Sequence, residues 1–307
     1  MVQPAHFPID LNWTGRPRSI ASAFLDFGGA PILIDPGPES TLSNLRSQLR
    51  SLGFSFSDLG AILLTHIHLD HAGATGSLLR ENPGLAVYVH EIGAPHLQDP
   101  SRLLASAGKL YGGEMQALFG AFLPVPAENI RILRGGETLR FGAGALRVLY
   151  TPGHASHHVT YWDAASATAF VGDTAGICIE GDSFILPAVP PPDINLELWN
   201  ASLDGISALR PSRLFLTHFG FSSDPQAHID RYRGRLAAWS ALAAKLLADG
   251  IPEDEAGRIF VDTVASEIGH ALSPADAEHY VFNGGLMLSW LGMARYVRKR
   301  AAAQGKL

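Results

Sequence analysis

Up to residue 225, the hydrophobic positions fall into short runs separated by glycine, proline and polar turns, a pattern typical of alternating strands and helices. Two apolar runs, 24–27 and 31–35, flank Gly28-Gly29 and predict a β-hairpin. Leucines recur at helical spacing over 41–52. Further apolar runs predict strands, the first of them buried on both faces, at 61–65, 87–89, 139–141, 146–150, 159–162, 169–171 and 214–216.

From residue 226 onward, the pattern changes to long helical segments. Alanine and leucine dominate 231–248, and a second helix is expected over 253–271. Ser273-Pro274 supplies an N-cap followed by proline at the first position of a third helix. The basic residues 298–300 suit the C-terminus of that helix.

Two longer segments, 94–126 and 181–195, interrupt the strand pattern of the first part. Residues 94–126 are expected to form helices closed by Pro124 and Pro126, and segments of this length in a compact domain often form functional walls or lids. The change of pattern divides the chain into two parts, 1–225 and 226–307. We expect the second part to be a helical C-terminal extension that packs on the first.

Composition narrows the classes of function. The formal net charge is −6 over 307 residues, which argues against a broad surface for nucleic acid. Residues 1–15 lack the basic start and apolar run of a signal peptide, and no segment has the ~20 apolar residues of a membrane helix. Cys178, the single cysteine, cannot form an internal disulfide and is expected to be a small buried residue. These features predict a cytoplasmic protein that acts on a small molecule, without nucleic-acid or membrane partners.

Three histidines and an aspartate stand within six positions after the 61–65 strand, in the pattern H-x-H-x-D-H. His66 and His68 are two residues apart, so in an extended segment both side chains point to the same side and can share one metal ion. Asp70 and His71 follow where the chain turns and can face a second ion. The C-terminal end of a strand is where α/β folds usually place ligands.

Three later strands each end in a residue of the same chemical type, namely His154, Asp173 and His218. Imidazole and carboxylate are the usual donors for zinc, and they also suit manganese and iron. A purely structural origin would require the same coincidence at four separate strands. We therefore expect the four strand ends to meet in one metal site.

The H-x-H-x-D-H motif, with Thr-Pro-Gly-His, Gly-Asp and Thr-His downstream, resembles the metallo-β-lactamase superfamily. The resemblance implies an α/β fold, a four-layer αβ/βα sandwich, in a catalytic domain of residues 1–225, and the helical C-terminal extension is similar to those of several members. It also implies two divalent metal ions, with zinc as the first expectation and manganese or iron as alternatives. One ion would be held by His66, His68 and His154, and the other by Asp70, His71 and His218, with Asp173 bridging both.

Such a site has a defined chemistry. Two adjacent cations lower the pKa of a shared water toward neutrality, and the bridging hydroxide can then attack a carbonyl or phosphoryl group. Asp70 is the best candidate for the catalytic residue that orients this nucleophile and moves its proton. Two divalent ions against two carboxylates leave the site positive, so anionic substrates would be tolerated.

Several residues have weaker claims on the site. His158 matches a position where the superfamily often has a histidine, and we expect it to support the ligands without binding metal. His157 is expected to line the pocket entrance. Phe184 and Ile185 could line an apolar substrate groove, with ordinary packing as the alternative.

Other residues are expected to be structural. Asp35 ends an early strand, where a hydrogen-bonding role toward nearby backbone is favoured over catalysis. His90 is expected to lie at the edge of the site or on the surface. The apolar stretch with Trp290 and Met293 is expected to pack in the core, with a homodimer interface as the second interpretation.

The predicted activity is hydrolysis of an ester, thioester or lactone-type bond. Two family members fit less well, because Thr174 to Ile177 lack the tyrosine that quorum-quenching lactonases usually carry, and no basic residues match those with which glyoxalase II binds glutathione. One alternative is a mono-iron persulfide dioxygenase that uses His66, His68 and His154 or an equivalent three-ligand set. Another is a metal-binding protein without turnover, against which the intact Asp70 argues.

Overall fold

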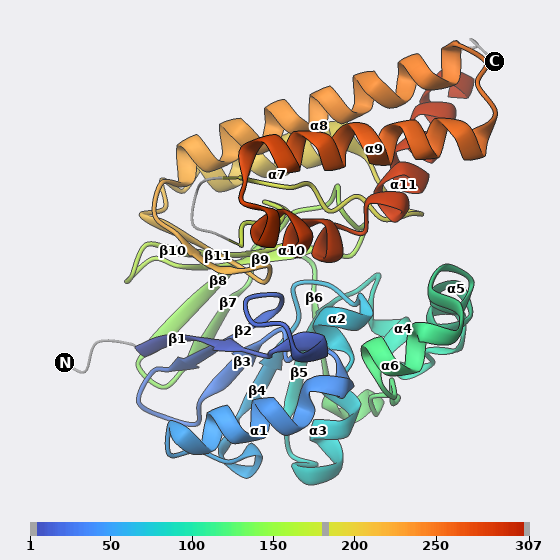
Figure 1. Cartoon of the computed structure of the whole chain (residues 1–307). Coiled ribbons are helices and arrows are strands. Elements are labelled where there is room, and N and C mark those ends of the chain that lie inside the picture. Colours follow the sequence, from blue (N-terminus) through green and yellow to red (C-terminus); the bar gives the residue numbers. More distant parts are fainter. Residues whose placement is uncertain (1–4, 180–183, 304–307) are drawn as a thin grey trace.

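Two six-stranded sheets face each other in the computed structural model, which describes residues 5–179 and 184–303 (Figure 1). The first sheet has its strands in sequence order, with antiparallel pairing from β1 to β3 and parallel pairing from β3 to β6. The predicted hairpin is its β2–β3 pair, in which Phe24 lies opposite Leu33. The six strands are β1 (Ala5–Asp10), β2 (Ala21–Asp26), β3 (Ile32–Ile34), β4 (Ala61–Leu63), β5 (Ala86–His90) and β6 (Ile130–Leu133).

The second sheet contains the later strands in the order β12-β11-β10-β9-β8-β7. All of its pairs are antiparallel except β10 with β11. The sequence pattern did not predict β1, β6 or β12, because β1 carries a proline at the sheet edge and β12 is only three residues long. The strands are β7 (Thr138–Phe141), β8 (Gly144–Tyr150), β9 (Val159–Asp163), β10 (Thr168–Gly172), β11 (Arg213–Leu216) and β12 (Gly220–Ser222).

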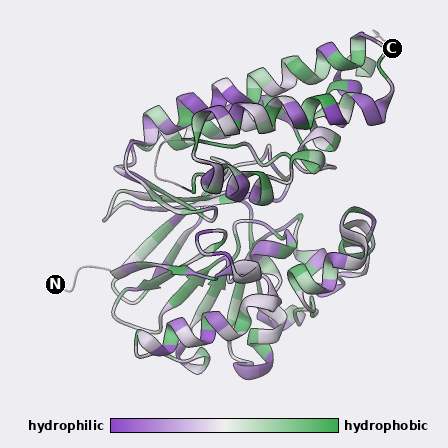
Figure 2. Cartoon of the chain, viewed as in Figure 1, coloured by the Kyte–Doolittle hydropathy of each residue, from purple (hydrophilic) through white to green (hydrophobic). Residues whose placement is uncertain are grey.

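Alternating side chains on the buried strands produce the layers. In β3, Ile32 and Ile34 belong to a core between the two sheets, whereas Leu33 packs on the opposite face. Leu33 shares that outer core with Leu45 and Leu49 of the helix predicted over 41–52. The order helix–sheet–sheet–helix confirms the expected four-layer sandwich, and Figure 2 shows the hydrophobic positions gathered on the strands.

Helices cover the outer faces of both sheets. The first sheet carries α1 (Leu42–Ser51) and α3 (Thr75–Glu81), and the short helix α2 (Leu69–Ala72) contains part of the histidine motif. The helical segment expected at 94–126 forms three α-helices, α4 (Ala94–Gln98), α5 (Ser101–Tyr111) and α6 (Met115–Phe119). The second sheet is covered by α7 (Leu196–Ala208) and by the C-terminal helices.

The C-terminal helices share one hydrophobic core with strands β10 and β11. In this core, Trp239 and Trp290 flank Phe260, with ring centroids 5.4 and 5.6 Å from it. Trp290 and Met293 are fully buried, so the core interpretation of this stretch holds and the stretch does not supply an exposed interface. Cys178 is buried as well. A homodimer stays a prediction.

The third C-terminal helix was predicted as one continuous element, and that prediction is wrong. The chain forms α8 (Pro225–Ala248), α9 (Glu253–Ala271), α10 (Pro274–Gly284) and α11 (Leu286–Ala303), with a break at Gly285. Gly285 has φ 49° and ψ 52°, a left-handed conformation that ends α10 and redirects the chain. Within the described ranges, no helix is long and apolar enough to cross a membrane.

Replacing Gly285 with alanine is expected to lower the free energy of unfolding by about 1–2 kcal/mol, because an L-residue is strained in the left-handed region. The added methyl group would meet only Leu288 at ordinary contact distance, so the cost comes from the backbone. Gly269→Ala is the matched control: its Cβ would meet open space inside α9, and it should stabilise the chain by about 0.5–1 kcal/mol. Denaturant unfolding of both variants measures the difference, and equal shifts would contradict the explanation.

Candidate metal centre

The four strand ends do meet in space. His66 and His68 follow β4, and His154, Asp173 and His218 follow strands β8, β10 and β11. Asp70 and His71 lie in α2, which begins immediately after His68. The seven residues form three overlapping groups whose ligand atoms lie within 4.8 Å of one another: His66, His68 and His154; His66, His71 and Asp173; and Asp70, His71 and His218.

The first group brings three imidazole nitrogens together. His68 Nδ1 lies 2.9 Å from His66 Nε2 and 3.0 Å from His154 Nε2. Burial lowers the pKa of His66 well below its ordinary value and lowers that of His68 to about 4. All three rings are therefore neutral at pH 7 and offer lone pairs at one point.

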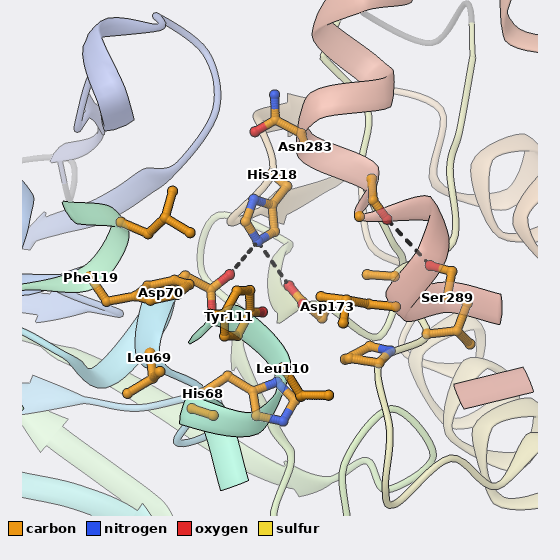
Figure 3. Close-up of a pocket in the computed structure, with 18 of the residues that line it drawn as sticks. His68, Leu69, Asp70, Leu110, Tyr111, Phe119, Asp173, His218, Asn283 and Ser289 are labelled. Carbon is orange, nitrogen blue, oxygen red and sulfur yellow. Dashed lines mark hydrogen bonds and ion pairs between the residues drawn. The ribbon is translucent and has the colours of Figure 1, made fainter. Parts of the chain in front are cut away.

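The carboxylates connect this group to the second. Asp173 Oδ1 is 3.2 Å from His71 Nε2 and 3.6 Å from His218 Nε2, while its other oxygen is 3.4 Å from His154 Nε2. Asp70 Oδ2 lies 3.4 Å from His218 Nε2 (Figure 3). Asp173 thus presents one oxygen to each group, and it is the only one of the seven side chains with an oxygen toward each.

Charge balance in the second group follows from these distances. Burial would raise the pKa of Asp70, but His71 and His218 outweigh it and hold that pKa at about 2. The pKa of Asp173 is likewise held well below its usual range. Burial would lower the pKa of His71 and of His218, but the neighbouring carboxylates raise both. A divalent cation here would take the place of the protons on these two rings.

The outward-facing nitrogens fix how the rings are protonated. His154 Nδ1 donates to the carbonyl of Ala188 at 2.9 Å, and His218 Nδ1 donates to the carbonyl of Ser19 at 2.8 Å. A carbonyl oxygen only accepts, so each Nδ1 carries the proton and each neutral ring turns the lone pair of Nε2 inward. Metal-binding histidines characteristically have such outer partners. The residues present therefore fit divalent metal ions.

Asp35 organises the second group from outside. Its carboxylate accepts hydrogen bonds from the Thr65 amide at 2.8 Å, from the Thr65 hydroxyl at 2.7 Å and from the Thr217 hydroxyl at 3.0 Å. It also lies 2.8 Å from His71 Nδ1. Sequence reasoning expected a role toward nearby backbone, whereas the partners are 30 or more residues away in the sequence. The only signal in the sequence was an aspartate at the end of a buried strand.

Asp35→Asn is expected to weaken metal binding by about 10–100-fold, because the amide cannot accept all of these hydrogen bonds and holds His71 less firmly. The measurement is competition for the metal with a chromophoric chelator. Asp26→Asn is the matched control, since Asp26 also ends a strand, and its carboxylate accepts a hydrogen bond from the nearby Gly28 amide instead of holding a candidate ligand. Equal affinity in both variants, with similar melting temperatures, would contradict this role for Asp35.

The two histidines after His154 have different positions. His158 lies 3.1 Å from the hydroxyls of Thr151 and Thr174 and accepts a hydrogen bond from the Asp173 amide at 3.2 Å. It belongs to none of the three groups, and it positions the backbone of Asp173. Gly172, which precedes Asp173, has φ 48°, and a side chain at this position would collide with His158.

Two expectations about the pocket are wrong. His157 is buried beside His66 and does not line the cavity described below, because its ring stacks against that of His66 inside the core. Phe184 and Ile185 are also buried away from the cavity, in the core under the C-terminal helices. Phe184 packs against Tyr280 and under Arg235, so ordinary packing is the correct interpretation. His90 is buried and stacks on Tyr150.

A cavity of about 380 Å³ opens directly onto the candidate metal centre. His68, Asp70, Asp173 and His218 form its inner end (Figure 3). Its walls come from α5 and α6 on one side and from the α10–α11 junction on the other. Ala188, Val189 and Pro190 complete it, so both long segments noted in the sequence contribute wall residues. Residues 181–183 of the second segment lie outside the described part of the chain.

The fold and this arrangement of residues define a metallohydrolase-type protein, and comparison with known proteins gives the family. The chain belongs to the metallo-beta-lactamase superfamily, whose family model matches residues 15–218. It is 28% identical over 202 residues to the metallo-beta-lactamase fold-containing protein ST1585 of Sulfurisphaera tokodaii, covering 62% of this chain and 69% of that protein. It is 29% identical over 233 residues to a hydroxyacylglutathione hydrolase of Cupriavidus taiwanensis, covering 73% of each.

Solved structures show the same architecture. The metallo-beta-lactamase family protein TTHA1429 from Thermus thermophilus aligns with a TM-score of 0.71 at 22% identity, covering 98% of this chain and 95% of that one. This likeness includes the C-terminal helices and concerns the fold. TTHA1623, solved in a di-iron-bound form, aligns with a TM-score of 0.53 at 28% identity, covering 71% of this chain and 94% of that one.

Proposed function

We propose that this chain is a binuclear metal-dependent hydrolase that cleaves an ester, thioester or lactone-type bond. The observation that carries the proposal is the position of Asp173, which offers one carboxylate oxygen to each of two groups of histidines. A site for one ion would not need a carboxylate shared in this way. The relatives named hydroxyacylglutathione hydrolase and the di-iron form of TTHA1623 support the same interpretation.

The candidate ligands have two roles, metal binding and orientation of the nucleophile. His66, His68 and His154 would hold one ion, and Asp70, His71 and His218 the other, with zinc first and manganese or iron as alternatives. When bound, two such ions supply Lewis acidity and make a hydroxide available at neutral pH. Asp70 is 26% exposed, whereas Asp173 is 5% exposed, so Asp70 is the carboxylate turned toward the substrate. Its pKa of about 2 keeps it ionised, and it orients the nucleophile by accepting a hydrogen bond.

The test starts with metal content. Protein purified without added metal should contain about two ions per chain, and it should hydrolyse members of an ester, thioester and lactone panel after reloading with zinc, manganese or iron. A single iron per chain, with oxygen uptake on glutathione persulfide, would instead establish the dioxygenase alternative. Two ions without any turnover on the panel would point to the non-catalytic alternative. A cytoplasmic location stays a prediction.

A further inference from the structure

The walls of the cavity at the metal centre are mostly apolar, and Ser106, Asn283 and Ser289 are the uncharged polar side chains among them apart from Tyr111. Beyond the inner end formed by the candidate ligands, the described lining residues are mainly aliphatic and aromatic. They include Leu103, Ala107, Leu110 and Tyr111 from α5 and its end, and Phe282 and Leu288 from α10 and α11. Burial raises the pKa of Tyr111 well above its ordinary value, with Asp70 and Asp173 adding to the effect, so this phenol stays neutral. Aliphatic and aromatic side chains outnumber these polar ones, so the walls suit an apolar ligand better than a polar one.

The described walls of the cavity lack positively charged side chains. Among the described residues that line the cavity, no lysine or arginine occurs, and the only charged side chain apart from the candidate ligands is Glu114. A substrate part with carboxylates, such as glutathione, would lack a cation to pair with and would meet Glu114. The tolerance for anions expected from the two metal ions therefore applies to the inner end alone.

The two apolar walls are held together by an N-terminal residue. The Trp13 ring lies 5.8 Å from that of Phe119 in α6 and 5.5 Å from that of Phe282 in α10. Its indole nitrogen donates to the Leu118 carbonyl at 2.6 Å. Arg16 lies over the Phe282 ring, with its guanidinium carbon 4.4 Å from the ring centroid. These contacts fix the separation of the walls and so make the cavity a preformed site.

We propose that this cavity binds the apolar acyl chain of an uncharged ester, thioester or lactone, with the reacting carbonyl beside Asp70 and Asp173. The inference rests on the proposed hydrolase function and names its substrate class. In the reaction, water adds to the carbonyl carbon and the bond from that carbon to oxygen or sulfur breaks. The leaving alcohol or thiol takes one proton, and the acyl part departs as a carboxylic acid.

The first experiment compares p-nitrophenyl esters from acetate to octanoate on the metal-loaded full chain. We expect kcat/KM to rise about fourfold per methylene until the chain fills the cavity, the factor that corresponds to ~0.8 kcal/mol for each buried methylene. An ester of similar length that ends in a carboxylate should react at least ~10-fold more slowly than its uncharged counterpart. A flat chain-length profile, or a preference for the carboxylate, would overturn the proposal.

A pair of variants on α5 ties this preference to the cavity. Ala107 is buried and lines the cavity, whereas Ala105 lies on the same helix, is exposed and does not line it. Ala107→Trp should lower the octanoate-to-acetate ratio of kcat/KM at least ~10-fold by filling the space. Ala105→Trp should leave the ratio unchanged. The same ratio in both variants would contradict the assignment.

A second variant covers the case in which Ala107→Trp does not fold. Leu110 lines the cavity and is only partly buried, so an arginine there can reach solvent. Leu110→Arg should weaken turnover of the octanoate ester and raise that of the carboxylate-ended ester. Unchanged rates for both esters in a folded Leu110→Arg protein would overturn the proposal.

A binding measurement separates this inference from the hydrolase function. Methyl octanoate should raise the melting temperature more than methyl acetate at equal concentration, and Ala107→Trp should remove the difference. Such stabilisation without hydrolysis of any ester would sustain the cavity assignment and reject the proposed activity. Hydrolysis without chain-length dependence in either measurement would sustain the activity and reject the apolar-chain specificity.

Discussion

Asp173→Ala is expected to lower kcat/KM at least ~1000-fold, equivalent to ~4 kcal/mol of transition-state stabilisation, and to reduce the metal content below two ions per chain. The physical reason is its shared position: its two oxygens lie 3.2 Å from His71 and 3.4 Å from His154. Removing both oxygens leaves Asp70 as the one carboxylate among the candidate ligands to balance the charge of two divalent cations, because the five histidines bind metal as neutral rings. Metal analysis and steady-state kinetics of the same preparation measure the two effects together.

A matched control is available in the same part of the chain. Asp193 is exposed and hydrogen-bonds to the Ser156 hydroxyl at 2.7 Å, away from the three groups of candidate ligands. Asp193→Ala should keep both the metal content and the activity of the unmodified chain. If Asp173→Ala bound two ions with unchanged kinetics, the bridging role and with it the binuclear proposal would be rejected.

Asp70→Asn is expected to lower kcat/KM by about 100–10,000-fold, the range that a positioned proton-handling group contributes. Asparagine keeps the size of the side chain but replaces one acceptor oxygen with a donor and removes the negative charge. Kinetics are measured at saturating metal, so that a loss of metal affinity is separated from a loss of catalysis. The exposed Asp204, which pairs with Arg233, provides the control variant Asp204→Asn.

Excess metal distinguishes the two roles of Asp70. If the rate of Asp70→Asn stays low when two ions per chain are bound, the carboxylate acts on the nucleophile. Full recovery of the rate of Asp70→Asn in excess metal would show that Asp70 acts only as a metal ligand and would contradict its catalytic role. The cavity-facing exposure of this side chain, 26%, leads us to expect the first result.

Most of the candidate ligands could be found from the sequence because they follow apolar strands within a few residues. His66 and His68 directly follow the strand that begins at Ala61, and Asp173 and His218 follow two other buried strands within two residues. Pairing aligns the ends of β8, β10 and β11 at one edge of the second sheet, and the packing of the two sheets against each other brings the end of β4 to them. The meeting point could be predicted because α/β folds usually place ligands at the C-terminal ends of strands. The layer order follows from the same alternation of side chains.

The surroundings of the site could not be derived in this way. Asp35 and His71 meet because parallel pairing places the end of β3 beside the end of β4. The sequence left Phe184 open between a substrate groove and ordinary packing, and the structure covers it with Tyr280, nearly a hundred residues later. The break at Gly285 was missed because glycine in a helical pattern is compatible with either continuation or a cap.

The sequence by itself thus singled out the seven residues at the candidate metal centre, because strand ends are local properties of the chain, and the resemblance of its motifs to the superfamily implied the sandwich. Tertiary structure alone decided what faces that centre. The cavity wall combines Trp13, α5 and the α10–α11 junction, segments separated by most of the chain length. Their apolar residues look like ordinary core residues in the sequence, because hydrophobicity does not tell whether a side chain packs against protein or is left open to a ligand.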